Sequence, residues 1–526
     1  MSLFRAFLLS ILFIIPACSP NVSSPSKSAA DPKGNNTTSP SEAAGVTSDD
    51  VLASAMHQLR PENFDLNSAT DKPVSLLNSW RFKQAEAKVF VDEAVPVLPP
   101  NEWVTAEELP RLAQPKFDAN DAEYIRDVLL HRAMSVYLAD RGNDDRSKVG
   151  EVVDYVCRNI AFWKDDELGI PLSLYWINMI GRGTAEDRAW VIAEVLKQLR
   201  IDSVILRPKS DVKGTSDKWL LGVLVDGQVL LYDVRLGVPL PNGEANKHSA
   251  ATLETIAAHP EWLEQLSTKT AYPITAQDLQ DLEIFVISNP NNWCRRMFNL
   301  EQVLPTNDLC VLYDPLVDHE GRKGLLNRIA TSVGRPTETL KLWPYPRQQI
   351  AEVGRSNAER DIERRQLTSV LNVPFQIKLD PKGQPGQPIP ERKMHRYRTE
   401  QILGHFKDAT TKYLGIRHLD VEPSPPILER INRMAAEDAL YWTTLCKYEL
   451  KEHATAIDLL LDYIRKYDRK GKWFFPARTL LAQCYADLDR LPEAMKTLEK
   501  TSSDDPYQDL NALRMKRWSA SLGKTK

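Results

Sequence analysis

Residues 189–199 constrain the fold most, because apolar side chains cover nearly the whole circumference of the helix that they predict. Spacings of three and four residues give this helix an inner face made by Ala189, Ile192, Ala193, Leu196 and Leu199. Its other sides carry Trp190, Val191 and Val195. A helix that is apolar all round is buried inside a domain. We therefore expect a core built around this helix.

Strand signals follow the helix directly. Residues 201–206 predict one strand, and residues 218–225 and 229–232 predict two more. The last two strands are joined by Asp226-Gly227, a typical two-residue hairpin turn. A buried helix followed by antiparallel strands predicts an α+β domain.

An amphipathic helix is predicted upstream, within residues 143–163. Asp144 or Asp145 would cap its first turn. Its apolar face is formed by Val149, Val152, Val153, Val156 and Ile160.

Residues 181–208 (GRGTAEDRAWVIAEVLKQLRIDSVILRP) and 218–241 (KWLLGVLVDGQVLLYDVRLGVPLP) resemble the core of the transglutaminase-like superfamily, whose fold is papain-like. In that family a nucleophilic cysteine opens the central helix, four residues before a small alanine. The small residue corresponds to Ala189 here, and the position of the nucleophile holds Ala185. The resemblance therefore implies the fold of the family without its nucleophile.

The resemblance also locates the other two members of the catalytic triad. Counting back from the hairpin turn, the histidine position falls at Lys218, or at Trp219 if the register shifts by one. Asp233 stands where the family has the residue that orients the histidine. A methyl group cannot attack a carbonyl, and a lysine with an ordinary pKa near 10.4 stays protonated. We therefore expect the degenerate triad of Ala185, Lys218 and Asp233 to be without catalytic residues.

Polar and aromatic residues close to these positions define a candidate cleft for a ligand, namely Asp187, Arg188, Trp219 and Arg235. The alternative interpretation is a buried ion pair or a solvated helix end. A rival functional hypothesis displaces the nucleophile to Cys157, which would make the protein a thiol-dependent hydrolase or acyltransferase. Against it stands the interpretation of Cys157 as a small residue that packs in the core.

The resemblance extends over about residues 118–320, the expected transglutaminase-like domain. Large bacterial transglutaminase-like proteins contain segments similar to ATLETIAAHPEWLEQL, to the WCRRMFNLEQVLP helix and to the VLYDP strand. Residues 51–117 predict extended chain and short helices that wrap this domain. Residues 321–390 predict a linker region with short helices.

Residues 391–526 predict a mostly helical region that ends in repeats. Residues 436–467 and 475–503 align with a shift of 38 residues, which matches Cys446 to Cys484 and Ala456 to Ala494. Both segments resemble tetratricopeptide repeats, and His395–Arg417 predicts a further, more divergent helical pair. The resemblance implies a surface for a protein or peptide partner.

The two matched cysteines are expected to be reduced packing residues. Equivalent helices of stacked repeats lie about 8–10 Å apart, which exceeds the reach of a disulfide. Cys294 and Cys310 are close enough in sequence to form one, and the sequence leaves their pairing open. The basic residues at the end of the chain are interpreted as a solvated tail: Arg514, Lys516, Arg517, Lys524 and Lys526.

The first 50 residues predict export. The apolar run Ala6–Ile15 follows the charge of Arg5, so residues 1–17 are interpreted as a signal peptide. The sequence Ile15-Pro16-Ala17-Cys18 resembles a bacterial lipobox, which implies lipidation of Cys18; an ordinary signal peptide cleaved nearby is the alternative. Residues 18–50 are rich in Ser, Pro, Asn, Thr and Ala and predict a disordered tether.

Charge and composition exclude other classes of function. The net charge is −4 with scattered Lys and Arg, so we expect no nucleic-acid partner. The nine histidines and six cysteines lack the spacing of metal ligands, so we expect neither metal nor cofactor.

The sequence thus predicts a non-catalytic lipoprotein of the cell envelope, on the outer membrane or the periplasmic face, attached to the membrane through lipid at Cys18. It would act as a scaffold or as a protein- or peptide-binding module.

Overall fold

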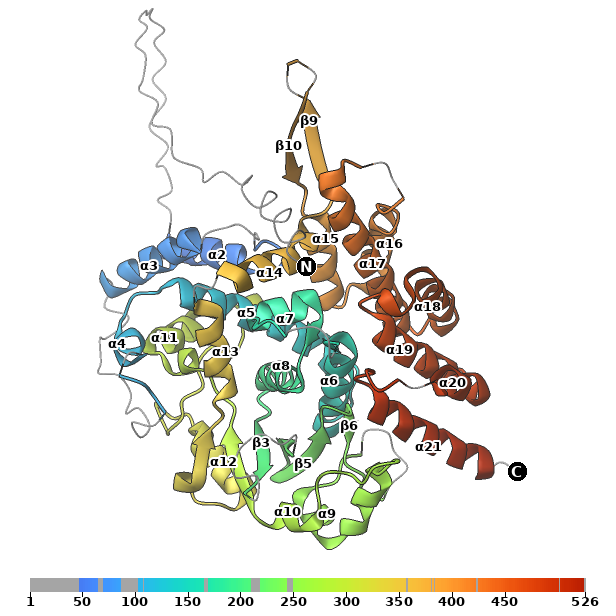
Figure 1. The fold of residues 1–526 in the computed structure, drawn as a ribbon. Coiled ribbons are helices and arrows are strands. Elements are labelled where there is room, and N and C mark those ends of the chain that lie inside the picture. The colour runs from blue at the N-terminus through green and yellow to red at the C-terminus, as the bar shows by residue number, and fades with distance from the viewer. Residues whose placement is uncertain are drawn as a thin grey trace, which may run out of the picture.

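The computed structural model describes residues 47–524, except 65–69, 87–102, 107, 165–168, 210–217, 244–248, 356–357, 380, 383, 422–423 and 501. The fold is mixed α+β, as the sequence predicts, with one six-stranded sheet among helices (Figure 1). The expected signal peptide, Cys18 and nearly all of the expected tether lie outside the described residues.

The main sheet has the strand order β6-β5-β4-β3-β7-β8, and only β7 and β8 run parallel to each other. Its strands are β3 (Ser203–Pro208), β4 (Leu220–Val225), β5 (Gln228–Asp233), β6 (Val238–Pro239), β7 (Leu282–Val286) and β8 (Leu340–Leu342). The predicted hairpin is confirmed, because β4 and β5 pair across Asp226 and Gly227, whose φ angles are 53° and 73°. Positive φ at both positions matches the right-handed twist of paired strands.

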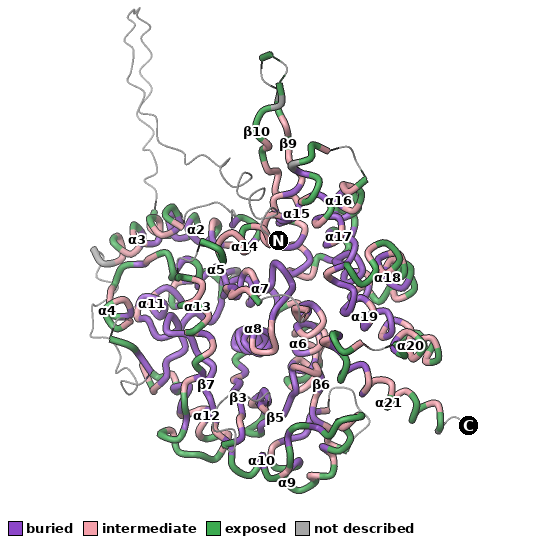
Figure 2. The backbone as a smooth tube through the Cα atoms, viewed as in Figure 1, coloured by how far each residue is buried: buried purple, intermediate pink, exposed green. Residues whose placement is uncertain are grey.

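The central helix α8 (Ala185–Lys197) lies on one face of this sheet with α5 (Ala119–Ala139), α6 (Asp145–Asn159) and α7 (Leu174–Ile180). Every residue of α8 from Asp187 onward is buried, and Figure 2 shows the helix enclosed by other elements. This confirms the sequence prediction of a buried helix. α6 begins after Asp144, which is the N-cap and forms a capping box with Ser147.

Strand residues alternate between the two faces of the sheet, as the pleat requires. Leu221 and Val223 belong to the core that contains α8, while Leu220 and Leu231 belong to a second core on the opposite face. The second core is lined by α9 (Leu253–Ala258), α10 (Ala276–Gln280), α11 (Arg295–Val303) and α12 (Leu325–Val333). The short strands β1 (Ala161–Phe162) and β2 (Arg182–Gly183) pair beside the start of α8.

Helices also precede the domain. α2 (Ser48–Leu59) and α3 (Asp71–Glu86) contact each other and pack on α5, and α4 (Glu108–Ala113) follows. The helices that wrap the domain are therefore present, and two of them are longer than the short helices expected from the sequence.

The segment 311–315 has no regular secondary structure, so the predicted VLYDP strand is wrong. Side chains take the place of a neighbouring strand. The Gln198 side chain accepts from the N–H of Val311 at 2.8 Å and donates to its carbonyl at 3.2 Å. One carboxylate oxygen of Glu301 accepts the N–H groups of Leu312 and Tyr313 at 2.8 and 2.7 Å. The backbone of residues 311–313 is therefore satisfied by side chains, while Asp314 and Pro315 hydrogen-bond to the backbone of Asn292 and Leu325.

Residues 321–390 contribute to the sheet and carry more structure than the expected linker. Besides α12 and β8, they form α13 (Tyr345–Gly354), α14 (Ala358–Thr368) and the hairpin of β9 (Phe375–Leu379) with β10 (Pro385–Pro390). The hairpin projects away from the rest of the chain (Figure 1). The sheet therefore extends beyond residue 320, where the sequence analysis ended the domain.

Three helical hairpins form the C-terminal region: α15 (Lys393–Ile402) with α16 (Phe406–Ile416), α17 (Pro426–Glu449) with α18 (His453–Tyr467), and α19 (Phe474–Asp487) with α20 (Leu491–Leu498). α21 (Gln508–Lys524) follows. The turns inside the hairpins repeat one backbone conformation, with positive φ of 87°, 61° and 57° at Gly404, Lys451 and Asp489. Five residues after each turn residue stands an alanine with 0% exposure, namely Ala409, Ala456 and Ala494.

This regularity supports the residue alignment made from the sequence. Lys451 and Asp489 are 38 residues apart, which is the predicted shift. Cys446 and Cys484 are free and fully buried, as predicted. Cys294 and Cys310 are free as well, which answers the question that the sequence left open.

The helical hairpins and the sheet domain share their cores. The core around α8 continues through Tyr441, Trp442 and Trp473, and the second core includes Phe474 and Tyr507. Polar contacts cross the same boundary, since Arg398 of α15 donates to the carbonyl oxygens of residues 178 and 179. The C-terminal region is therefore part of one folded unit.

Candidate functional site

The start of α8, where the resemblance found in the sequence predicts the nucleophile position, is closed by hydrogen bonds. Thr184 and Asp187 form a capping box around Ala185, and the Tyr345 hydroxyl donates to Asp187 at 2.8 Å. Burial raises the pKa of Asp187 to about 6. The carboxylate of Asp187 thus caps the first turn of α8 in a buried position, which differs from both the buried ion pair and the solvated helix end considered from the sequence.

Asp233 lies at the end of β5 and on the sheet face opposite α8. Its carboxylate accepts the backbone N–H groups of Arg235 and Leu236 at 2.9 and 3.1 Å, and the Tyr272 hydroxyl donates to it at 2.8 Å. Arg235 also forms an ion pair with Asp233 at 3.0 Å. These contacts hold the turn after β5 and leave Asp233 directed away from Ala185.

The two residues considered for the histidine position lie in different surroundings. Lys218 pairs with Asp278 at 3.5 Å. Trp219 is buried in the core of α8, so the register shifted by one residue is the one that faces the helix. The guanidinium of Arg235 lies 5.9 Å from the centroid of the Trp219 ring. The structure thus brings Asp233, Arg235 and Trp219 together but does not bring the three triad positions to one point.

Arg188 lies in the first turn of α8. Of the four predicted cleft residues, it is the one that lines the cavity between α6 and the C-terminal helices. It is 1% exposed, and its side chain donates to the carbonyl oxygens of Ile160 and Val234 at 2.8 and 3.1 Å. Its guanidinium stacks over Phe162 at 3.6 Å. Among the described residues, Arg188 forms no ion pair with a carboxylate.

Cys157 on α6 approaches the same strand end. Its thiol donates to the carbonyl oxygen of Val234 at 3.8 Å, and Gly237 passes so close that a Cβ there would lie 3.1 Å from the Cβ of Cys157. Burial raises the pKa of the Cys157 thiol to about 11. Of the histidines in the described ranges, none hydrogen-bonds to this thiol. The thiolate that a nucleophile requires is therefore disfavoured.

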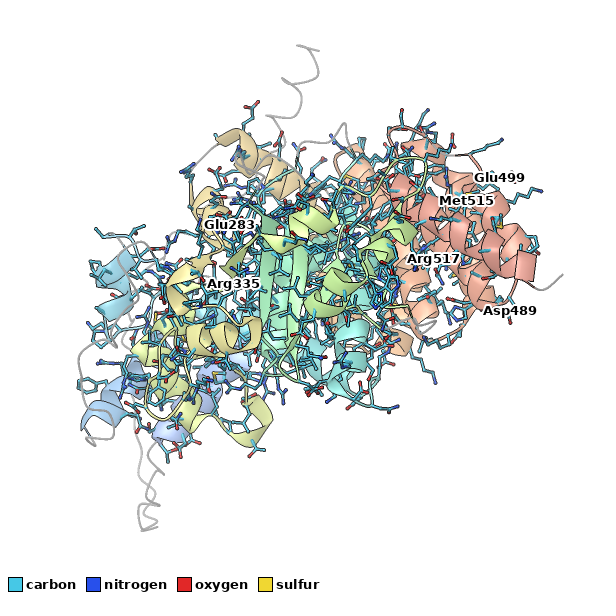
Figure 3. The ribbon with its side chains drawn as sticks, turned by 90° about the horizontal axis from the view of Figure 1, so that it is seen from below. Glu283, Arg335, Asp489, Glu499, Met515 and Arg517 are labelled. Carbon is cyan, nitrogen blue, oxygen red and sulfur yellow. The ribbon has the colours of Figure 1, made fainter. Side chains whose placement is uncertain are left out.

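A cavity of about 480 Å³ separates α6 and the segment around β6 from α17, α19 and α21. Cavities that bind small ligands have volumes of about 300–1,000 Å³. Its charged lining consists of Asp154, Arg158, Arg188, Arg514 and Arg517. Figure 3 labels Arg517 where the C-terminal helices meet the rest of the molecule.

The C-terminal arginines were not expected to belong to a site. The cluster of basic residues was interpreted as a solvated tail, and this is wrong for three of its members, since Arg517 lines the cavity together with Arg514. Arg514 lines the cavity and donates to the carbonyl of Thr479, while Lys516 donates to carbonyl oxygens of residues 264, 265 and 267. The amphipathic pattern of residues 508–524 is the signal that would have indicated a docked helix instead of a tail.

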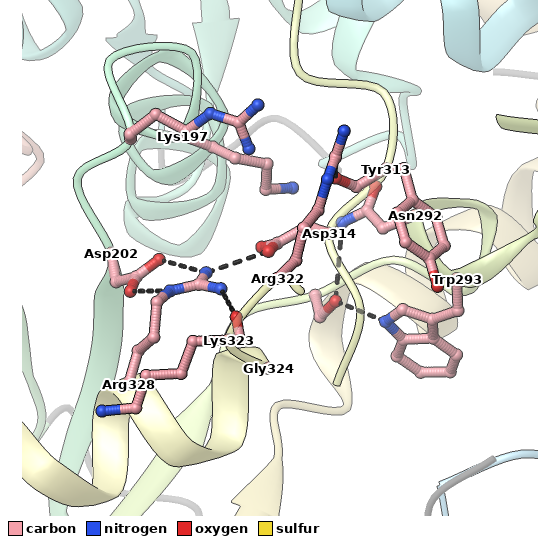
Figure 4. Close-up of polar contacts among 12 residues, drawn as sticks. Lys197, Asp202, Asn292, Trp293, Tyr313, Asp314, Arg322, Lys323, Gly324 and Arg328 are labelled. Carbon is pink, nitrogen blue, oxygen red and sulfur yellow. Dashed lines mark hydrogen bonds and ion pairs between the residues drawn. The ribbon is translucent and has the colours of Figure 1, made fainter. Parts of the chain in front are cut away.

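A second cavity, of about 350 Å³, lies at the far end of α8 and is lined by several cations. Figure 4 shows Arg328 in contact with Asp202, Asp314 and the carbonyl oxygen of Lys323. Arg328 bridges Asp202 and Asp314 at 2.8 and 2.9 Å, and Lys197 pairs with Glu194 at 2.8 Å. We interpret this network as a structural brace between α8, α12 and the irregular segment 311–315.

Comparisons with family models, with curated proteins and with solved structures find no match for this chain. Within the part of the chain that the structure describes, none of the helices has the length and apolar character needed to cross a bilayer.

Proposed function

We propose that this protein is a non-catalytic lipoprotein of the cell envelope that binds a protein or peptide partner. The partner would dock at the helical repeats and enter the cavity between them and a degenerate transglutaminase-like domain. The observation that carries the proposal is the 480 Å³ cavity itself, because the domain and the C-terminal helices both line it. Concave surfaces of stacked helical hairpins commonly bind peptides.

The attachment to the envelope is part of the same proposal. Lipid at Cys18 would anchor the chain, and the residues between Cys18 and α2 would tether the folded unit at a distance from the membrane. The folded unit would then meet partners in the space beside the membrane.

The rival function, a thiol enzyme that uses Cys157, makes a different prediction for alkylation. We expect Cys157 to react with iodoacetamide at pH 7 at least about tenfold more slowly than a free cysteine, because its thiol is protonated and half-buried. Mass spectrometry of the native protein measures the rate, and urea-unfolded protein provides the reference. Rapid labelling of the native protein at Cys157 would favour the enzyme and contradict the proposal.

Binding at the cavity is tested by blocking it without changing charge. Gln483 of α19 lines the cavity, so Gln483→Trp would place an indole in it. We expect the immobilised wild-type protein to capture partners from an envelope extract that Gln483→Trp fails to capture. Gln508→Trp, on an exposed position at the start of α21, is the matched control and should capture them all. Identical captured sets for the wild type and Gln483→Trp would refute the cavity as the binding site.

These point variants are preferable to removal of the repeats. A chain that ended near residue 390 would lose side chains that fill both cores, so a loss of binding would follow from unfolding alone. A substitution at the cavity wall leaves both cores intact.

A further inference from the structure

We propose that the cavity between the sheet domain and the C-terminal helices recognises the carboxylate of a short apolar peptide through Arg514, Arg517 and Arg188. This inference rests on the proposed function and specifies the chemistry of its ligand. It is carried by three arginines around one cavity for which the described residues supply no carboxylate partner.

The charge balance of the lining is strongly positive. Four arginines and one aspartate, Asp154, line the cavity. Arg158 forms an ion pair with Glu449 at 2.7 Å, which neutralises its charge. No carboxylate of the described residues lies within ion-pair distance of the other three arginines. Of these three, Arg188 is buried, Arg514 is half-buried and Arg517 is exposed at the edge of the cavity. A buried cation such as Arg188 is normally paired in proteins, because removing a charge from water costs several kcal/mol. The cavity therefore has the electrostatics of an anion site.

Arg188 is the deepest of these cations. Backbone carbonyls occupy its Nε and Nη1, while its Nη2 is buried without a hydrogen-bond partner. An acceptor oxygen of a ligand at this nitrogen would remove the free-energy cost of a buried donor without a partner. Arg514 and Arg517, one turn apart on α21, carry the positive charge towards the outer part of the cavity.

The remaining walls are apolar and aromatic. They include Tyr441, Tyr507, Leu480, Leu510 and Pro476. An inorganic anion would leave this surface uncovered, whereas an apolar peptide that ends in a carboxylate would satisfy both parts of the lining. Arginine and carboxylate form paired, charge-assisted hydrogen bonds, which are among the strongest polar contacts in proteins.

The first experiment measures how much a negative charge on the ligand increases its affinity for the cavity. The fluorescent probes 8-anilinonaphthalene-1-sulfonate and N-phenyl-1-naphthylamine share an aromatic body and differ in the sulfonate. We expect the full-length protein to bind the anionic probe at least about tenfold more tightly than the neutral one. Equal affinities for the two probes would overturn the anion site.

Variants then assign the binding to the cavity. Arg514→Gln combined with Arg517→Gln should weaken binding of the anionic probe by at least about tenfold and leave the neutral probe unaffected. Arg188 is left unchanged, because it also holds Ile160 and Val234 in place. Arg465→Gln, at an exposed position of α18 whose side chain is 81% exposed, is the control and should change neither affinity. Unchanged affinity for the anionic probe in the double variant would refute the assignment.

The second experiment identifies the ligand class by displacement of the bound anionic probe. An equimolar mixture of N-acetylated tripeptides built from Ala, Leu and Phe is added with free carboxylates, and in parallel as the C-terminal amides. We expect the acids to displace the probe and the amides to fail at tenfold higher concentration. Displacement by laurate but by neither peptide mixture would overturn the peptide and indicate a lipid carboxylate.

The two proposals fail separately. If Gln483→Trp abolishes capture of partners while the two probes bind equally, the proposed function stands and the anionic ligand is wrong. If the probes discriminate as expected but Gln483→Trp captures every partner, the cavity binds an anion and the proposed partner site is wrong.

Discussion

Replacing Glu449 with glutamine is expected to lower the free energy of unfolding by about 3–5 kcal/mol at pH 7. The Glu449 side chain is fully buried at the end of α17, where it pairs with Arg141 at 2.8 Å and with Arg158 at 2.7 Å. Glutamine keeps the size of the side chain but removes its charge. Arg158 of α6 then loses its ion pair with α17, while Arg141 retains its pair with Glu151 at 3.1 Å.

The effect of Glu449→Gln should depend on pH in a defined direction. The two arginines hold the pKa of Glu449 below its ordinary value of 4.5, although burial alone would raise it. A carboxyl group with a lowered pKa in the folded state stabilises the protein above its unfolded pKa, and this stability is lost as the pH falls through the folded pKa. The difference between wild type and variant should therefore be complete at pH 7 and shrink below about 4.5.

Urea denaturation at pH 7 and at lower pH measures both quantities. Glu429→Gln is the matched control, because Glu429 lies on the same helix in an exposed pair with Arg433 whose side chains are 63% and 64% exposed. We expect that variant to change stability by less than about 0.5 kcal/mol. An equal, small effect of both variants would show that Glu449 does not fasten α17 to the domain.

Truncating Trp473 to alanine is the second change with a large expected effect, a loss of about 3–5 kcal/mol. The indole is 1% exposed and stacks on Tyr441 with ring centroids 4.6 Å apart. Its N–H donates to Asp438 at 2.7 Å, and the Arg182 guanidinium lies 5.8 Å from the ring centroid. The variant leaves a cavity where α17, α19 and the start of α8 meet, and it deprives a buried carboxylate of a donor.

The measurement is again the free energy of unfolding in urea, with far-UV circular dichroism to establish that the variant is folded in water. Phe82→Ala is the control, because Phe82 of α3 is 63% exposed and its removal creates no cavity. We expect a change of less than about 0.5 kcal/mol for that variant. A loss at Trp473 no larger than at Phe82 would mean that the helical region is only loosely attached.

Local structure was predictable wherever neighbouring residues decide it. The cap at Asp144, the turn at Asp226-Gly227 and the burial of α8 all follow from spacing within a few residues, and the structure confirms them. The 38-residue shift between repeats was readable for the same reason, since each hairpin forms from contiguous chain.

The candidate site was predictable only in part. Of the four cleft residues proposed from the sequence, Arg188 lines the cavity between the sheet domain and the repeats. Asp187, Trp219 and Arg235 are used in a helix cap, a core and a turn. The arginines of α21 were missed because nothing within residues 508–524 indicates which surface the helix covers.

The sequence by itself determined the buried helix α8, the β4–β5 hairpin and the 38-residue shift between two helical hairpins, because these depend on residues that are near one another in the chain. Only the tertiary structure decided that residues 311–313 are held by the side chains of Gln198 and Glu301 instead of a strand. Only the tertiary structure decided, too, that residues from 154 to 518 surround one cavity. Such contacts depend on how helices and strands pack against one another after they form. A local pattern of apolar and polar residues does not specify which distant segment a helix or strand will contact.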